Sequence, residues 1–198
     1  MAASERDETA RTDYRATVMH QAAERFVFRD ESGTRTTLTR LYGWAPHDQQ
    51  ATEAVPRRRG KHTTFIAALT WDGLQAPWTV EGAMDRRTFD VYITQILVPT
   101  LRPGQIVVLD NLSVHKSPTA RAAIEAAGCT LQFLPAYSPD LNPIEQMFSK
   151  VKATLRRLKG RTRAALLDAL AVASDAVTPA DAHGWFIHAG YRLVASSS

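Results

Sequence analysis

Three acidic residues lie next to predicted strands and helices, at positions where the presence of a carboxylate has to be explained. The strand-like run 25–29 ends in Asp30, the apolar run 106–109 is followed by Asp110, and Glu145 lies in the first turn of a predicted helix. Hard divalent cations such as Mg²⁺ take one or two carboxylates together with water and phosphate oxygens. If the fold brings the three acids together, they predict metal-dependent chemistry at a phosphodiester.

Each acid also has a purely structural interpretation. Asp30 and Asp110 are turn formers that follow predicted strands. Glu145 follows Asn142 by three residues with Pro143 between them. This pattern is typical of a capping box, in which the glutamate only accepts a backbone N–H. Spacing alone leaves both interpretations open for all three acids.

Glu31 competes with Asp30 for the role of first acid. Side chains alternate along a strand, so Asp30 shares a face with Phe26 and Phe28, whereas Glu31 points to the other face. The alternation favours Asp30. Asp140, a further acid near Glu145 in the sequence, is expected in a loop.

The elements that would carry the acids follow from hydrophobic periodicity and turn residues. The predicted order is three strands, helix, strand, helix, strand and helix, with one or two more helices from Thr162 onward. The predicted strands are 25–30, 39–44, 63–69, 106–109 and 129–134, and the predicted helices are 85–101, 118–127 and 143–158. One apolar stripe along the last of these helices is expected to pack on the sheet.

Composition places the chain among ordinary globular proteins. Of its 198 residues 44% are apolar and 22% charged, and no apolar run approaches the roughly 20 residues of a membrane span. Cys129 is the only cysteine, and the N-terminus lacks the apolar core of a secretory signal, so we expect a cytoplasmic protein. The net charge of +4 suits a polyanionic partner. Zinc and nucleotide cofactors are not expected, because the histidines lack paired ligand spacing and no glycine-rich phosphate loop is present.

Two long motifs surround the second and third acids, 108–116 (VLDNLSVHK) and 134–145 (LPAYSPDLNPIE). Together with 28–33 (FRDESG) they resemble the signature of bacterial DDE transposases of the IS-six-thirty family, relatives of the mariner superfamily. The 34 residues between Asp110 and Glu145 match the spacing of such enzymes. The resemblance covers nearly the whole chain.

The resemblance implies an α/β fold of the ribonuclease-H-like kind, a mixed five-stranded sheet flanked by helices. The catalytic domain with its C-terminal helices would span 24–198, and 1–23 would be a linker or remnant segment. Asp30, Asp110 and Glu145 would be catalytic and would hold two Mg²⁺ or Mn²⁺ ions. The implied activity is cleavage and strand transfer of double-stranded DNA, at the element ends and a TA target, in cut-and-paste transposition.

If the partner is DNA, the basic residues are candidates for contacts with its backbone. A neighbouring face of the 143–158 helix begins at Glu145 and continues with lysine and arginine, so it is either a solvated face or a DNA-backbone contact. We predict DNA contacts for Lys152, Arg156, Lys159, Lys116, Arg57 and Arg58. Asn111 and His115, with Lys116, either position phosphate or metal or are ordinary turn residues.

Two features depart from the family pattern. About 25 residues precede the first acid, so the helix-turn-helix region that recognises element ends is expected on a separate N-terminal half. Phe148 stands where a tryptophan is often found, which should preserve the fold. A homodimer is expected by analogy. Two other functions stay open: a truncated, non-catalytic remnant that binds DNA or intact transposase and regulates it, and a cellular nuclease of the same fold.

Overall fold

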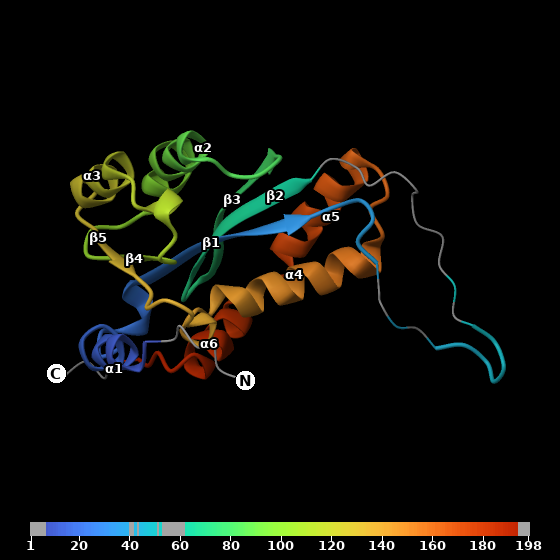
Figure 1. Cartoon of the computed structure of the whole chain (residues 1–198), viewed down its shortest axis with the longest axis horizontal. Coiled ribbons are helices and arrows are strands. Elements are labelled where there is room, and N and C mark those ends of the chain that lie inside the picture. Colours follow the sequence, from blue (N-terminus) through green and yellow to red (C-terminus); the bar gives the residue numbers. More distant parts are fainter. Residues whose placement is uncertain (1–6, 40–41, 43, 51, 53–61, 194–198) are drawn as a thin grey trace.

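A mixed five-stranded β-sheet separates two layers of helices in the computed structural model, which describes residues 7–39, 42, 44–50, 52 and 62–193 (Figure 1). The order of strands across the sheet is β3-β2-β1-β4-β5. The first three strands in the chain form an antiparallel meander, and β4 and β5 extend it in parallel with β1. The strands are β1 (Phe26–Thr34), β2 (Thr63–Thr70), β3 (Gly73–Glu81), β4 (Ile106–Leu109) and β5 (Thr130–Phe133). This confirms the predicted five-stranded mixed sheet.

Helices cover both faces of the sheet. In Figure 1, α2 and α3 lie on one face, whereas α4, α6 and α1 lie on the other, with α5 beside α4. The helices are α1 (Glu8–Thr17), α2 (Arg86–Val91), α3 (Pro118–Ala126), α4 (Ile144–Leu158), α5 (Arg163–Asp175) and α6 (Pro179–His188). A π-helical turn (Tyr92–Leu97) and a 3₁₀ turn (Val98–Thr100) continue α2, so the predicted helix 85–101 is present in three parts. None of the described helices is both long and apolar enough to cross a membrane.

Alternation along β1 distributes its side chains between two cores. Phe26 and Phe28 are buried on the side of α4 and α6, where the Phe28 ring lies edge-on to Phe186 at 5.4 Å between ring centroids. Val27 is buried on the other side, against α2 and α3. Asp30 has the parity of Phe26 and Phe28, so β1 directs it toward the α4 layer.

One predicted strand is wrong. Thr39, Tyr42 and Trp44, the described residues of the range 39–44, lie outside any strand, and the Tyr42 side chain is 90% exposed. The third strand of the meander is instead β3, residues 73–81, which pairs with β2 across a register shift. The sequence of β3 hides it, because Pro77 and a polar, half-exposed face are typical of an edge strand and weaken the apolar signal.

The helix α4 agrees closely with its prediction. Its apolar stripe is buried from Ile144 to Leu155, whereas Leu158, the last residue of the stripe, is 42% exposed. Phe148, at 3% exposure, packs edge-on against Phe65 of β2. The helix ends at Lys159 in the left-handed conformation (φ 53°). Gly160 follows where a Cβ would lie 2.7 Å from the Ala165 carbonyl oxygen, so only glycine permits α5 to approach this closely.

The N-terminal helix α1 is tied to both the C-terminal segment and the loop before α4. The Arg11 guanidinium is fully buried and donates to both Asp140 carboxylate oxygens, at 2.9 and 2.6 Å. The Tyr191 hydroxyl donates to the Leu141 carbonyl oxygen at 2.9 Å and lies 3.1 Å from the Tyr14 hydroxyl. Two segments distant in sequence therefore hold residues 140–141, immediately before the third predicted acid's helix.

The tyrosine pair gives a test of this attachment. Tyr191→Phe should lower the free energy of unfolding by about 1–3 kcal/mol, because it leaves the buried Leu141 carbonyl without its donor. Tyr14→Phe should cost less, about 0.5–1.5 kcal/mol, because Tyr191 keeps its bond to Leu141. Urea unfolding of both variants measures the difference. Equal losses, or a larger loss for Tyr14→Phe, would contradict the role of Tyr191 as the donor to the Leu141 carbonyl.

Candidate active site

Parallel pairing of β1 with β4 brings the first two predicted acids to the same level. Phe28 is aligned with Val108 in the register. Asp30 lies two residues beyond Phe28, and Asp110 lies two residues beyond Val108. Both carboxylates therefore lie at the same level of the sheet, where neighbouring strands are roughly 4.8 Å apart. Asp110 directly follows β4, whereas Asp30 lies within β1 and not at its end as expected, because pairing with β2 extends β1 to Thr34.

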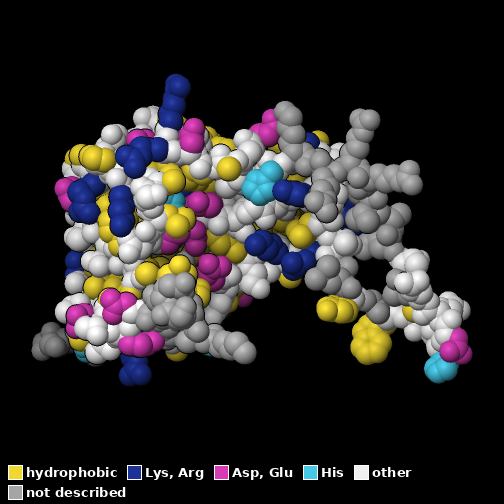
Figure 2. Space-filling model, in the orientation of Figure 1, with side chains coloured by type: hydrophobic (Ala, Val, Ile, Leu, Met, Phe, Trp, Pro, Cys, Tyr) yellow, Lys and Arg dark blue, Asp and Glu magenta, His cyan; other side chains and the backbone are white. Residues whose placement is uncertain are grey.

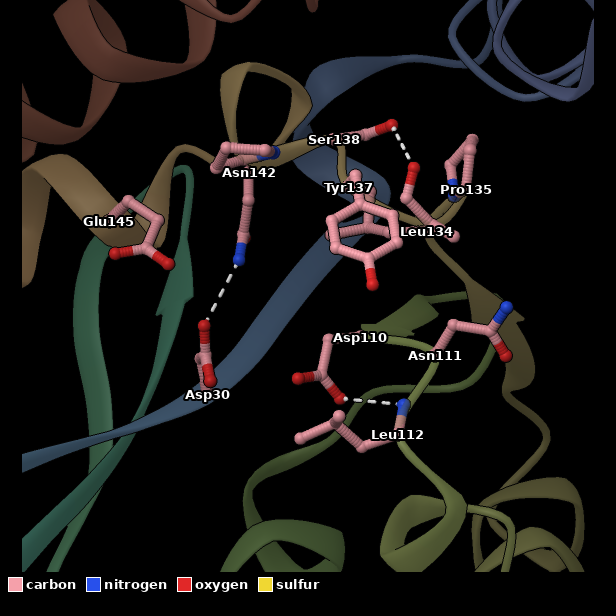
Figure 3. A pocket seen from close by; sticks show the side chains of 12 residues that line it. Asp30, Asp110, Asn111, Leu112, Leu134, Pro135, Tyr137, Ser138, Asn142 and Glu145 are labelled. Carbon is pink, nitrogen blue, oxygen red and sulfur yellow. Dashed lines mark hydrogen bonds between the residues drawn. The ribbon is translucent and has the colours of Figure 1, made fainter. Parts of the chain in front are cut away.

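The third acid reaches the other two from the first turn of α4. Glu145, Asp30 and Asp110 line one pocket of 380 Å³, together with the loop that links β5 to α4. In Figure 3 the three carboxylates face a common space from three separate elements. The structure therefore brings together all three acids that the sequence analysis selected.

Asn142 holds the first of these acids. Its side-chain amide donates to Asp30 Oδ2 at 3.1 Å (Figure 3). The Glu31 backbone N–H donates to Asp30 Oδ1 at 2.7 Å. No side-chain cap is present at the start of α4. The capping-box interpretation is therefore wrong: Asn142 reaches across to β1 instead of capping its own helix.

A buried chain of polar side chains holds the second acid from the other face of the sheet. His115 Nδ1 hydrogen-bonds Asp110 Oδ1, which also accepts the Leu112 N–H at 3.3 Å. His115 Nε2 lies 2.9 Å from the Arg29 guanidinium, which can only donate, so the proton on Nδ1 points at Asp110. Arg29 in turn donates to Glu31 at 2.6 Å.

Arg29 is stabilised in this fully buried position by more than its carboxylate partner. Its guanidinium carbon lies 4.9 Å from the Phe89 ring centroid and 5.3 Å from that of Tyr92. Burial alone would raise the pKa of Glu31, but the His115 ring, 3.5 Å from its carboxylate, and the charge of Arg29 outweigh it, and that pKa is lowered. Glu31 therefore carries a negative charge here as the partner of Arg29, not as a lining residue of the acidic pocket.

Among the described residues, no lysine or arginine forms an ion pair with Asp30, Asp110 or Glu145. Burial raises the pKa of Asp30 to about 7, and the negative charges of Glu31, Asp110 and Glu145 contribute to the rise. The hydrogen bond from the Glu31 N–H opposes the shift but does not reverse it. A cation in the pocket would relieve this repulsion.

The donor set suits hard cations that complete their shell with other oxygens. Among the residues that the structure describes, no three His, Cys, Asp or Glu side chains form a ready-made site for one ion. Mg²⁺ and Mn²⁺ do not require such a cage, because Mg²⁺ binds through one or two carboxylates plus water and phosphate oxygens. The carboxylates of this pocket fit that mode of binding, with Asp30 and Asp110 each held by hydrogen bonds on one side.

The described residues predicted to contact DNA do not line the acidic pocket. Lys116 is exposed after the 3₁₀ turn Ser113–His115, Lys152 and Arg156 are half-buried on α4, and Lys159 is exposed at its end. Arg57 and Arg58 lie outside the described residues. Asn111 lines the acidic pocket and is exposed.

Sequence reasoning missed two residues at the pocket rim and the arginine behind it. Tyr137 is 57% exposed and has φ 53°, a conformation that non-glycine residues adopt at a cost. Leu112, on the opposite wall, is 54% exposed. A large exposed aromatic on strained backbone is a signal that only the structure reveals. Arg29 looked like an ordinary strand residue because its partner His115 is 86 positions away.

Solved structures of one transposase share the fold. A crystal structure of the Mos1 mariner paired-end complex with Mn has a TM-score of 0.71 at 16% identity, covering 94% of this chain and 61% of that one. A pre-cleavage Mos1 transpososome has a TM-score of 0.69 at 16% identity, covering 91% and 56%. The catalytic domain of Mos1 alone has a TM-score of 0.60 at 15% identity, covering 91% and 82%. The chain thus spans little more than half of the Mos1 chains in the complexes, and its sheet and helices have their ribonuclease-H-like arrangement.

The sequence itself identifies the family. No curated protein matches the chain. The family model described as DDE superfamily endonuclease matches residues 25–166, a range that holds all three acids and most of the sheet and helices that position them. The chain therefore belongs to the DDE superfamily endonucleases.

Proposed function

We propose that this chain is the catalytic domain of a DNA transposase of the IS-six-thirty type, which cuts DNA and transfers a strand at a metal-dependent site. Asp30, Asp110 and Glu145 are its catalytic acids. The observation that carries the proposal is the convergence of these acids, from β1, β4 and α4, on one pocket of a DDE endonuclease domain.

The residues around the acids prepare the pocket for its ligands. Asn142 and the Glu31 N–H orient Asp30, and His115 orients Asp110, so that their carboxylates face the pocket in fixed positions. Two bound Mg²⁺ or Mn²⁺ ions would activate the attacking oxygen and stabilise the leaving oxygen at phosphorus. The high pKa of Asp30 means that metal and proton compete for this carboxylate.

Double-stranded DNA is the proposed substrate. The similar structures include Mos1 paired-end, pre-cleavage and strand-transfer complexes, one of them described with a left transposon end. Lys152, Arg156, Lys159 and Lys116 would contact its phosphates, as would Arg57 and Arg58 outside the described residues. We further propose a TA target, a homodimer that cuts two ends, and a separate N-terminal helix-turn-helix half that recognises them. The segment 1–23 would join the two parts, with α1 packed on the catalytic domain at 24–198.

The acids make the first prediction. The native chain should nick supercoiled plasmid in Mg²⁺ or Mn²⁺ but not in EDTA. Asp110→Asn and Glu145→Gln should each lower the rate by at least about 100-fold, because each removes a carboxylate from the site. Circular dichroism checks folding. A native chain that folds and binds DNA without nicking it would instead support a regulatory remnant.

A second prediction concerns pH and the metal-free fold. The pKa of Asp30 in the folded chain, about 7, lies above its ordinary value of 3.8. The protonated carboxyl is therefore favoured by folding, and the stability that this gives is present at low pH and lost as pH rises through 7. Asp30→Asn should therefore raise the free energy of unfolding in EDTA by about 1–3 kcal/mol near pH 8 and by much less near pH 5. Urea unfolding at both pH values measures this. A gain that does not change with pH would contradict the electrostatic account.

A third prediction separates positioning from folding at His115. His115→Ala should weaken Mn²⁺ binding by about 10–100-fold, because Asp110 loses the donor that orients it. His115→Asn can still present an N–H near Asp110 and should recover part of that affinity. Isothermal calorimetry measures binding, and thermal unfolding checks each variant. Equal affinities for the Ala and Asn variants would show that the hydrogen bond to Asp110 does not matter for metal binding.

A further inference from the structure

A second groove, of 450 Å³, lies at the far end of β1. Its walls come from the end of β1 and the segment after it, from the residue before β2, and from α4. The side chains that matter here are Thr34, Arg35, Thr37, Leu38, His62 and Arg156. No acidic side chain is among the described residues that line it, so its charge is opposite to that of the acidic pocket.

Two elements connect this groove with the acidic pocket. Along β1, Asp30 and Thr34 point to the same face, four residues or about 13 Å apart. Along α4, Glu145 and Arg156 lie within about 20° of each other around the helix axis, eleven residues or about 16 Å apart. Lys152 lies between them on the same stripe and lines a small cavity with Thr34. One side of the β1–α4 layer therefore begins with acids and ends with cations.

Figure 2 shows this change of charge on one face of the molecule. Acidic side chains gather near the middle of the face, and lysine and arginine side chains lie to their right, close to a histidine. A single extended ligand crossing this face would meet both kinds of charge.

Polar groups in the groove lack partners. The Thr34 hydroxyl is buried and has no hydrogen-bond partner. Within the described part of the chain, Arg35 and Arg156 pair with no carboxylate. A buried hydroxyl without a partner is unfavourable, and unpaired guanidinium groups beside it favour an anionic ligand with several acceptor oxygens.

The wall of the groove is held in place by its neighbours. Arg161 donates to the Thr36 and Leu38 carbonyl oxygens, at 3.3 and 2.9 Å, and so fixes the segment that follows β1. The His62 ring lies over Gly33, where a Cβ would come within 2.3 Å of its Nε2 atom. The contacts that hold this wall in place therefore do not involve Arg35, Arg156 or the Thr34 hydroxyl.

We propose that this groove binds a backbone phosphate of the same DNA whose scissile phosphate lies at the acids. This rests on the proposed function. Arg156 and Arg35 hold the phosphate, and the Thr34 hydroxyl donates to it. The separation of about 16 Å is roughly half a turn of duplex, so a DNA molecule that crosses the acids passes the groove within that length. The groove therefore fixes how the DNA lies along α4 and carries no base specificity.

The test is DNA binding in EDTA, measured by fluorescence anisotropy over a series of salt concentrations. Arg156→Gln and Arg35→Gln should each weaken binding several-fold and reduce the slope of log affinity against log salt by about 1, because each loses one phosphate contact. Thr34→Val removes a hydroxyl but no charge. It should weaken binding by about 2–5-fold and leave the slope unchanged.

Arg157→Gln is the matched control. Arg157 is exposed on the same helix, one residue further and about 100° around it, and its substitution removes the same charge. Affinity and slope should match those of the native chain. Equal losses for Arg157→Gln and Arg156→Gln would overturn the groove in favour of diffuse attraction, as would unchanged binding by Arg156→Gln or no binding by the native chain.

The binding and nicking experiments test the groove and the proposed function independently. A native chain that nicks plasmid while Arg156→Gln binds normally would reject the groove and keep the proposed function. A chain that binds through Arg156, Arg35 and Thr34 but nicks nothing in Mg²⁺ or Mn²⁺ would reject the catalytic proposal and keep the groove.

Discussion

Parallel hydrogen bonding between β1 and β4 aligns Phe28 with Val108, and the acidic pocket depends on that register. Because side chains alternate along a strand, a slip of one residue would turn Asp30 toward the α2 layer and bring Glu31 to the side of α4. The register is enforced by burial, since Phe26 and Phe28 fill one core and Val27 fills the other. The same apolar contacts that stabilise the sheet therefore decide which carboxylate reaches the pocket.

Such a pocket concentrates negative charge, and in the described part of the chain its acids are held by hydrogen-bond donors other than lysine or arginine. Asp30 accepts from an amide and a backbone N–H, and Asp110 accepts from a histidine and a backbone N–H. The buried cation Arg29 lies on the opposite face of β1, paired with Glu31, and reaches Asp110 only through His115. An arginine bonded directly to Asp30 or Asp110 would lower its pKa but occupy the oxygens that a metal needs. Without such an arginine, burial and the neighbouring negative charges raise the pKa of Asp30.

Local patterns in the sequence predicted most of the elements and the three acids, whereas contacts between residues far apart in the sequence could not be predicted. The strands around Asp30 and Asp110 and the stripe of α4 follow from periodicity, and the motifs linked them to one family. Asn142 was interpreted as a cap because its neighbours Pro143 and Glu145 fit that pattern, but its amide bonds a carboxylate 112 residues away. The network of Arg29 and His115 was invisible for the same reason. Edge strand β3 was missed, and a strand was wrongly placed at 39–44, because a half-exposed strand gives a weak apolar signal.

The loop before α4 lies between helix α1 and the acidic pocket and contacts both. Arg11 holds Asp140 and Tyr191 holds the Leu141 carbonyl, and Asn142, which bonds Asp30, is the next residue. Three consecutive residues are thus fixed by three different parts of the chain. Because the Arg11 guanidinium is fully buried, its two bonds to Asp140 attach α1 firmly to this loop. The acid on β1 is therefore linked through one short loop to α1, the helix that precedes the sheet in the chain.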